Sequence, residues 1–205
     1  MRNLFIILFC FPILIYAQLS DEQIVVEYTA DHKLPLLKKM LKKTLPKKYT
    51  VYYSEDAYRV EFSNSFSLLG ADLKIEGYQI DNYSTLKSLV LYSVIAEKEG
   101  EGKKDTTDYI KEDIFIDSIS KINYTGEEKT ILGYKCVGFT FEDDESEMKG
   151  FLTTEFSAIG AIIDGVNYGL PMYIEDYNKE ENMTEILHVK SVNIEPLKPS
   201  YYITE

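Results

Sequence analysis

Histidine, cysteine and tryptophan are scarce in this chain, and their scarcity limits its chemistry. The 205 residues include two histidines, His32 and His188, two cysteines, Cys10 and Cys136, and no tryptophan. A zinc site needs three or four ligands at characteristic short spacings. The two histidines lie far apart in sequence, so we expect no metal site and no transition-metal catalysis.

Common catalytic motifs are missing as well. The sequence has no G-x-S-x-G nucleophile elbow, no glycine-rich phosphate loop and no H-E-x-x-H pair. Cys136 lies in an apolar stretch that we predict to be a strand, where a buried and inert thiol is expected. His188 is interpreted as a core or sheet-face histidine. We therefore expect no cofactor and no enzymatic activity.

Positive charge is in short supply. The chain has 22 Lys and Arg against 34 Asp and Glu, which gives a formal net charge of −12. Such a field repels nucleic acid and, on average, anionic lipid. We expect no nucleic-acid partner.

Only one long apolar run occurs, at residues 4–16, with Arg2 before it and Ala17 after it. It is shorter than the roughly 20 residues that a membrane-spanning helix needs, and its layout is that of a secretory signal. We predict a signal peptide, residues 1–17, cleaved after Ala17, and one β-rich domain, residues 18–205, that is periplasmic or secreted. Cys10 lies inside the run and not at its end, so we do not expect a lipoprotein.

Alternating apolar and polar residues predict strands along most of the remaining chain. Residues 50–62 place two apolar runs around a turn at residues 54–56, which predicts a hairpin with Tyr58, Val60 and Phe62 on one face. In the predicted strand 183–194, alternation places five residues on one face: Ile186, His188, Lys190, Val192 and Ile194. Further strands are predicted at residues 23–29, 73–81, 86–96, 119–127, 134–141, 149–156 and 172–178.

The spacing of these strands, without regular helical crossovers, favours antiparallel pairing. We predict a mainly β (α+β) fold, in which one large curved antiparallel sheet forms a half-barrel with one or two helices packed on its concave side. Residues 97–115 begin with charged residues and glycines, which predict an exposed loop. Their second half could form one or two helical turns with Tyr109, Ile110 and Ile114 inward. A single thiol remains after signal removal, so the fold depends on its core and not on disulfides.

Residues 34–45, LPLLKKMLKKTL, predict an amphipathic helix. Leucines lie on one side of the helical wheel, and Lys38, Lys39, Lys42 and Lys43 lie on the other. From residue 33 to residue 48 there are seven lysines and no acid. Three interpretations stay open: the leucine face covers the concave side of the sheet, the helix lies on an anionic membrane, or it contacts a partner protein.

Several segments resemble exported Bacteroidetes proteins of unknown function, including the GLPGLI group. The stretch EKTILGYKCVGFTFE at residues 128–142 is similar to their I-x-G-Y-K-C signature, and GLPM at residues 169–172 is similar to their G-L-P turn. Residues 51–62, 78–94 and 196–203 resemble further segments of that group. The tryptophan that is usual in that group is absent here. Residues 150–155, GFLTTE, occupy the corresponding position.

This resemblance implies a half-barrel like that of the periplasmic lipoprotein carriers (LolA/LolB-like), whose concave face takes acyl chains. Two functions follow as expectations. The first is a monomeric envelope protein that binds a lipid or a lipoprotein acyl chain against the sheet. The second is an interaction or envelope-structural module that has a filled core and contacts another envelope protein.

Overall fold

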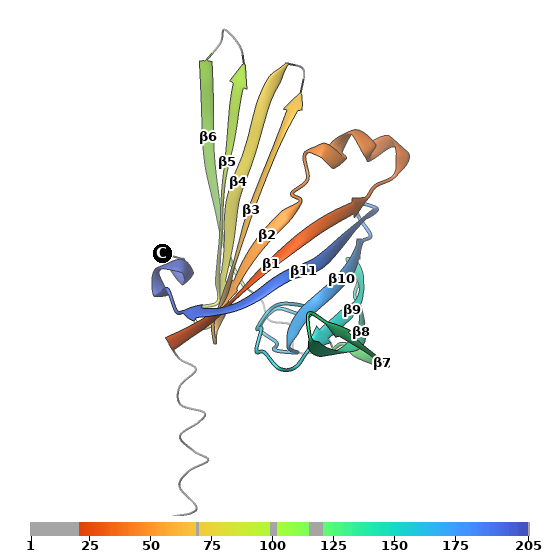
Figure 1. The fold of residues 1–205 in the computed structure, drawn as a ribbon. Helices are drawn as coiled ribbons and strands as arrows, with labels where there is room; N and C mark the ends of the chain where they lie inside the picture. Colours follow the sequence, from red (N-terminus) through yellow and green to blue (C-terminus); the bar gives the residue numbers. More distant parts are fainter. Residues whose placement is uncertain (1–20, 69, 99–101, 115–120, 205) are drawn as a thin grey trace, which may run out of the picture.

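The structure is a computed structural model that describes residues 21–68, 70–98, 102–114 and 121–204. The predicted signal peptide, residues 1–17, lies outside the described residues. The described chain forms one antiparallel sheet of eleven strands in the order β6-β5-β4-β3-β2-β1-β11-β10-β9-β8-β7 (Figure 1). The strands are β1 (Glu22–Lys33), β2 (Lys48–Tyr53), β3 (Ala57–Leu68), β4 (Ala71–Asn82), β5 (Lys87–Lys98), β6 (Gly102–Asp113), β7 (Asn123–Ile131), β8 (Tyr134–Glu142), β9 (Ser146–Thr153), β10 (Leu170–Asn178) and β11 (Met183–Pro196).

Two meanders make up this sheet. Strands β1 to β6 follow one another in space as in sequence, and so do β7 to β11. The first and last strands join the two meanders, because β1 pairs with β11 from Glu22↔Pro196 to Lys33↔Thr184. The ends of the sequence therefore form the centre of the sheet, and the edges are β6 and β7.

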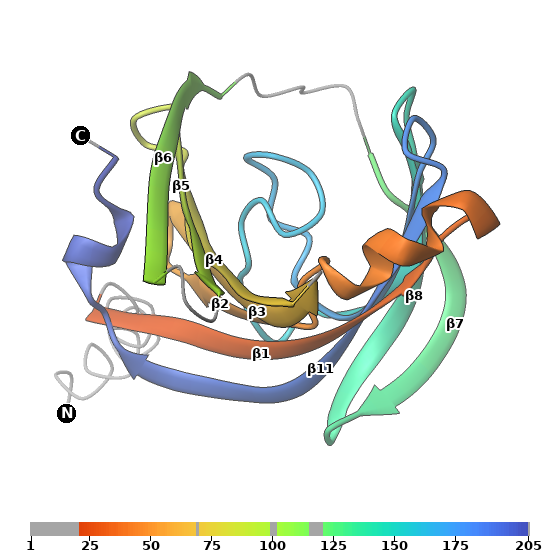
Figure 2. The same cartoon turned by 90° about the horizontal axis from the view of Figure 1, so that it is seen from above.

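The sheet curves strongly but does not close, as the view from above shows (Figure 2). We call its concave side the inner face and its convex side the outer face. The register Val26↔Val51↔Val60 carries the inner face from β1 across β2 to β3. The predicted curved antiparallel sheet is thus confirmed, and Tyr58, Val60 and Phe62 share a face as predicted.

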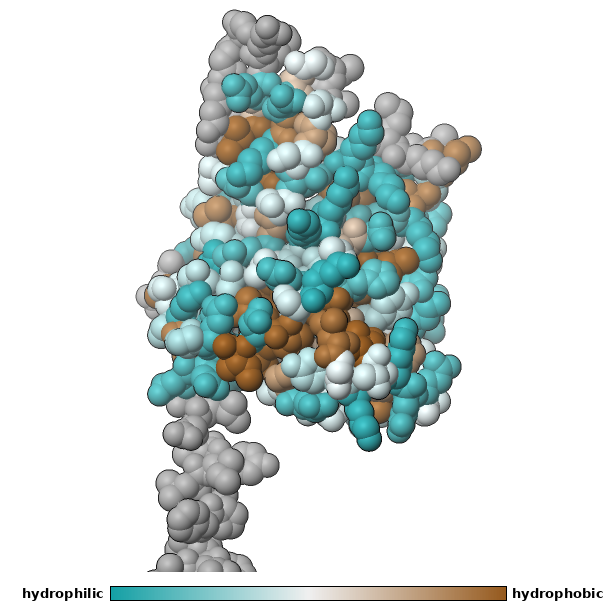
Figure 3. Space-filling model, viewed as in Figure 1, coloured by the Kyte–Doolittle hydropathy of each residue, from teal (hydrophilic) through white to brown (hydrophobic). Residues whose placement is uncertain are grey.

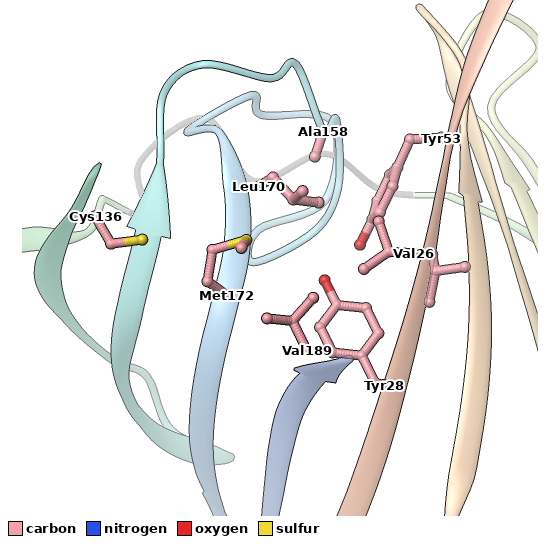
Figure 4. Packing of buried hydrophobic residues seen from close by; sticks show 9 residues of the cluster. Val26, Tyr28, Tyr53, Cys136, Ala158, Leu170, Met172 and Val189 are labelled. Carbon is pink, nitrogen blue, oxygen red and sulfur yellow. The ribbon is translucent and has the colours of Figure 1, made fainter. Parts of the chain in front are cut away.

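The segment between β9 and β10, residues 154–169, lies on the inner face, and we call it the plug (Figure 2). Figure 4 shows Ala158 of the plug together with Leu170 and Met172 of β10 facing Val26, Tyr28 and Tyr53 of the sheet. The buried Tyr28 hydroxyl donates a 2.7 Å hydrogen bond to the Pro171 carbonyl. A second cluster of buried residues continues this core: Ile122, Phe139, Phe141, Leu152, Ile163 and Ile174.

Asn167 organises the plug. Its side-chain oxygen accepts hydrogen bonds from the backbone N–H groups of Ala158 and Gly169, both at 3.1 Å. Its amide nitrogen donates to the Ser157 hydroxyl at 2.6 Å. These bonds satisfy backbone groups that no strand pairing serves, which buried polar groups require.

Gly160 allows the plug to lie directly against the β4–β5 turn. Its φ is +71°, and a Cβ atom there would stand 2.0 Å from the Tyr83 hydroxyl oxygen. Only glycine fits both the backbone conformation and this contact.

The C-terminal segment packs on the outer face. It includes the 3₁₀ helix η3 (Pro199–Tyr202). The Tyr202 hydroxyl donates to the Gln23 side-chain oxygen at 3.0 Å. The Arg59 guanidinium lies between the rings of Tyr78 and Tyr201, at 3.8 and 4.9 Å from their centroids.

The predicted α-helix at residues 34–45 differs in the structure. Its place is taken by the 3₁₀ helix η2 (Leu36–Lys43), which connects β1 to β2 at the rim of the sheet (Figures 1 and 2). The described residues contain no α-helix, so the prediction of helices on the concave side is not confirmed. The plug occupies the inner face instead, and Leu36 is 78% exposed.

Residues 97–115 also differ from the prediction of an exposed loop. Strand β6 (Gly102–Asp113) pairs with β5 over its whole length. Residues 106–113 are all exposed, because this is an edge strand without a covering layer. Its polar composition concealed a strand that the neighbouring strand holds in place.

The predicted common face in residues 183–194 is wrong for a local reason. Tyr28 pairs with Val189 while Glu27 pairs with Ser191, so Lys190 is an extra residue in a β-bulge. A bulge reverses the side-chain alternation beyond it. Val192 therefore shares the inner face with Val26, whereas His188 stacks on Tyr173 of β10 at 5.1 Å between ring centroids.

Two glycine substitutions test the contact between the plug and Tyr83. Gly160 and Gly126 both have positive φ, +71° and +79°, but a Cβ at Gly126 would meet nothing within 4 Å. We expect Gly126→Ala to lower the free energy of unfolding by about 1–2 kcal/mol through backbone strain alone. Gly160→Ala should cost about 1–3 kcal/mol more, because it also overpacks against Tyr83. Urea denaturation measures both, and equal losses would contradict this packing.

Candidate functional site

The inner face has two parts, which we call the filled part and the open part according to whether the plug covers them. The plug covers the part formed by β1, β2 and β8–β11, where the buried core lies. The part formed by β3–β6 rises past the plug (Figure 1). The open part is the candidate site.

Apolar side chains line this open part, and we call them the upper trough. Register places them on the inner face: Val60 pairs with Gln79, and Gln79 pairs with Val90. All are half-buried. They are Phe62, Phe66, Leu73, Ile75, Val90 and Val94.

Gly77 gives the upper trough a flat floor. A Cβ atom there would stand 2.3 Å from the Leu91 carbonyl oxygen and 2.9 Å from the Phe62 ring. The ring therefore lies across β4 at this point, where any larger residue would displace it. The floor combines backbone with an aromatic ring, an arrangement that suits an extended apolar group.

The outer face of the same strands is also partly apolar (Figure 3). Val94 and Ile95 are neighbours on β5, and both are half-buried on opposite faces of the sheet. This pair allows the two faces to be tested separately.

Polar groups bound the upper trough where it meets the plug. The Gln79 amide donates to Asp81 at 2.7 Å, and Asp81 is 4% exposed. The Tyr83 hydroxyl donates to Asp164 of the plug at 3.0 Å. The trough thus has one polar end, where the second amide hydrogen of Gln79 could donate to a ligand headgroup. The Tyr83 hydroxyl has given its only hydrogen to Asp164 and can only accept there.

A second polar group lies on the inner face of β1, β11 and β10, where His32, Glu185 and Asp176 pair in one register row. His32 Nε2 and the Tyr49 hydroxyl both contact Glu185 Oε1, at 2.9 and 2.8 Å. Burial, followed by the charge of Glu185, raises the pKa of Tyr49 well above its ordinary value. His32 lies beyond the strand predicted at residues 23–29, and only strand pairing brings the two carboxyl groups to it.

Asp176 is the residue of this row whose ionised form is least well accommodated. Its Oδ1 atom is buried without a hydrogen-bond partner among the described residues. Burial, and then the charges of Glu185 and Asp143, raise the pKa of Asp176. Within the part of the chain that the structure describes, no group of three or more His, Cys, Asp or Glu residues could hold a metal ion.

The four lysines predicted as contact residues have different surroundings. Lys38 forms a 2.6 Å ion pair with Glu181 and also donates to the Glu181 carbonyl at 2.9 Å. Lys42 and Lys43 are exposed. The side chain of Lys39 lies outside the described residues. Cys136 is buried in β8, as predicted.

Sequence reasoning did not find the upper trough. Alternation in β3, β4 and β5 marks the apolar residues, but it does not show which face is covered.

A hollow of about 840 Å³ lies elsewhere, between the β2–β3 turn and the C-terminal segment, and is lined by Glu55, Asp56, Tyr202 and Ile203 among others. Among the described residues, no helix is long and apolar enough to cross a membrane.

Comparison with known proteins gives only distant likenesses. Neither a protein-family model nor a curated protein matches the chain. Structures of PNGF-II in the P21 and C2 space groups align with 90% of this chain at 12% identity, with TM-scores of 0.44 and 0.41. The chain spans 30% of PNGF-II in each case. An outer membrane lipoprotein-sorting protein domain from Vibrio parahaemolyticus aligns over 89% of both chains, at 8% identity and a TM-score of 0.25. These scores are too low to support a functional argument.

Asp176 and its neighbour Glu175 should influence stability in opposite directions. The pKa of Asp176 is raised in the folded state, so its ionisation destabilises the fold as pH rises through that pKa. Asp176→Asn should therefore raise the melting temperature at pH 7. This increase should become smaller as the pH falls below the pKa of Asp176, where its carboxyl group is already neutral.

Glu175 serves as the matched control. Hydrogen bonding from Lys33 lowers the pKa of Glu175, so its stabilising contribution is present above the unfolded-state pKa and is lost in acid. Glu175→Gln should slightly lower the melting temperature at pH 7. Melting curves between pH 3 and pH 7 measure both effects. A lower melting temperature of Asp176→Asn at pH 7 would contradict the claim that ionised Asp176 destabilises the fold.

Proposed function

We propose that this chain is an exported binding protein that takes a lipid acyl chain or a similar apolar group on the upper trough. The supporting observation is the set of six half-buried apolar residues on the inner face of β3–β5 beyond the plug. Leu73, Ile75 and Val94 belong to this set. Covering such surface releases water and contributes about 0.8 kcal/mol for each methylene that is buried.

The binding mode follows from the shape of the trough. An extended chain would lie over Gly77 and against Phe62, with its polar end towards the free amide hydrogen of Gln79. Specificity for length would come from the plug, which blocks the inner face beyond Tyr83. The role is binding rather than catalysis, and the expected signal peptide would bring the protein to the periplasm or outside the cell.

An interaction module is the second candidate function. The plug favours it, because the deepest part of the inner face is already filled by Ala158, Leu170 and Met172. In that case the upper trough would be covered by a segment of another envelope protein, and no acyl chain would compete for it.

Substitutions at Val94 and Ile95 distinguish the two faces of β5. Each residue is replaced by glutamine, which is polar and uncharged, so neither change alters the attraction of a fatty-acid carboxylate. A neutral hydrophobic fluorescent probe is titrated into each protein and then displaced with a long-chain fatty acid. We expect Val94→Gln to weaken fatty-acid binding by about tenfold, equivalent to roughly 1.4 kcal/mol.

The Ile95→Gln variant is the control for this experiment. Its side chain lies on the outer face, so its affinity should match that of the unmodified protein. Equal weakening in both variants would place the probe outside the trough. Probe binding that fatty acid cannot displace would favour the interaction module.

A further inference from the structure

The 3₁₀ helix η2 (Leu36–Lys43) is fixed at the rim of the sheet, next to the inner face (Figures 1 and 2). At its end, the Asn64 side-chain amide of β3 donates to the Lys43 carbonyl at 2.7 Å. Near its start, Lys38 is tied to Glu181 in the β10–β11 turn by a 2.6 Å ion pair. Both meanders therefore hold this helix, and its orientation relative to the sheet is set.

The segment that contains the helix is basic in an acidic protein. No Asp or Glu occurs between Lys33 and Lys48, although the whole chain has a net charge of −12. Lys42, Lys43 and Lys47 are exposed there, and so is Lys48. We call these four lysines the rim lysines.

An apolar side chain lies at the opposite end of the same helix. Leu36 opens the helix and is 78% exposed, the most exposed large hydrophobic residue among those described. Exposed lysines and an exposed leucine on one rim segment match the membrane interface, where lysines meet anionic headgroups and a leucine enters the acyl boundary. Outward-facing acids elsewhere on the molecule would be repelled by the same surface.

We propose that the rim lysines and Leu36 dock this protein on an anionic lipid surface, with the rim of the sheet towards the bilayer. Lysines near an anionic surface each add to the attraction, so four of them suffice for reversible binding. A protein partner is less well matched, because stable protein interfaces bury about 1,200–2,000 Å². One eight-residue helix offers far less than this, whereas electrostatic docking on lipid needs no matching shape.

This docking does not depend on ligand binding in the upper trough. It would, however, bring the open end of β3–β6 close to the lipid surface, since the Asn64 contact places the helix beside β3. A rim variant that no longer binds vesicles should keep its affinity for fatty acid. Failure of one proposal therefore leaves the other measurable.

Vesicle sedimentation tests the proposal with the exported protein as recovered from its host. We expect binding to phosphatidylcholine vesicles that contain phosphatidylglycerol, little binding to pure phosphatidylcholine vesicles, and release in high salt. Lys42→Glu/Lys43→Glu should weaken binding at least about tenfold, because it removes two attractions and adds two repulsions. Leu36→Ser should weaken it less.

Lys121→Glu/Lys135→Glu is the matched control. It makes the same change in net charge at two exposed lysines that lie outside residues 33–48. This variant should bind the vesicles within about twofold of the unmodified protein. Three results would overturn the proposal: equal losses in both double variants, equal binding to neutral vesicles, or no vesicle binding by the unmodified protein.

Discussion

The contact between the plug and the centre of the sheet is the interaction on which the rest of this structure depends. Val26, Tyr28 and Tyr53 come from the first strands, and Leu170 and Met172 come from the strand that follows the plug. A sheet bent this strongly exposes its inner face unless something fills it. Because the plug supplies that filling, the two meanders share one core, and the pairing of β1 with β11 is buried beneath it.

The same contact determines where a ligand could bind. The plug ends at Tyr83, which it meets through Gly160 and Asp164. Beyond this point the apolar inner-face residues of β3–β5, including Phe62, are half-buried, and the face continues to the rim. The filled part of the sheet, on one side of Tyr83, thus stabilises the fold, and the open part, on the other side, is the proposed binding surface. The 3₁₀ helix η2 contacts both β3 and the β10–β11 turn, so it links the open part to the second meander.

Sequence reasoning recovered the antiparallel strands and the β2–β3 hairpin, because alternation there is regular and the turn is polar. It missed β6, whose polar residues are held by pairing with β5 and not by burial. It assigned one face to residues on both sides of Lys190, from Ile186 to Ile194, because a bulge leaves no mark in the alternation. The helical periodicity of residues 34–45 was real, but the plug, which has no period, occupies the inner face.

The site was harder to predict than the fold for a related reason. Apolar residues in β3–β5 can be found in the sequence, but their exposure depends on where residues 154–169 end in space. The most direct test is photocrosslinking with a long-chain fatty acid that carries a photoreactive group near its end, followed by peptide mapping. The account predicts adducts on the inner-face residues Phe62, Ile75 and Val94. Adducts on the plug or on outer-face residues such as Ile95 would contradict it. So would inner-face adducts that an excess of unlabelled fatty acid does not suppress.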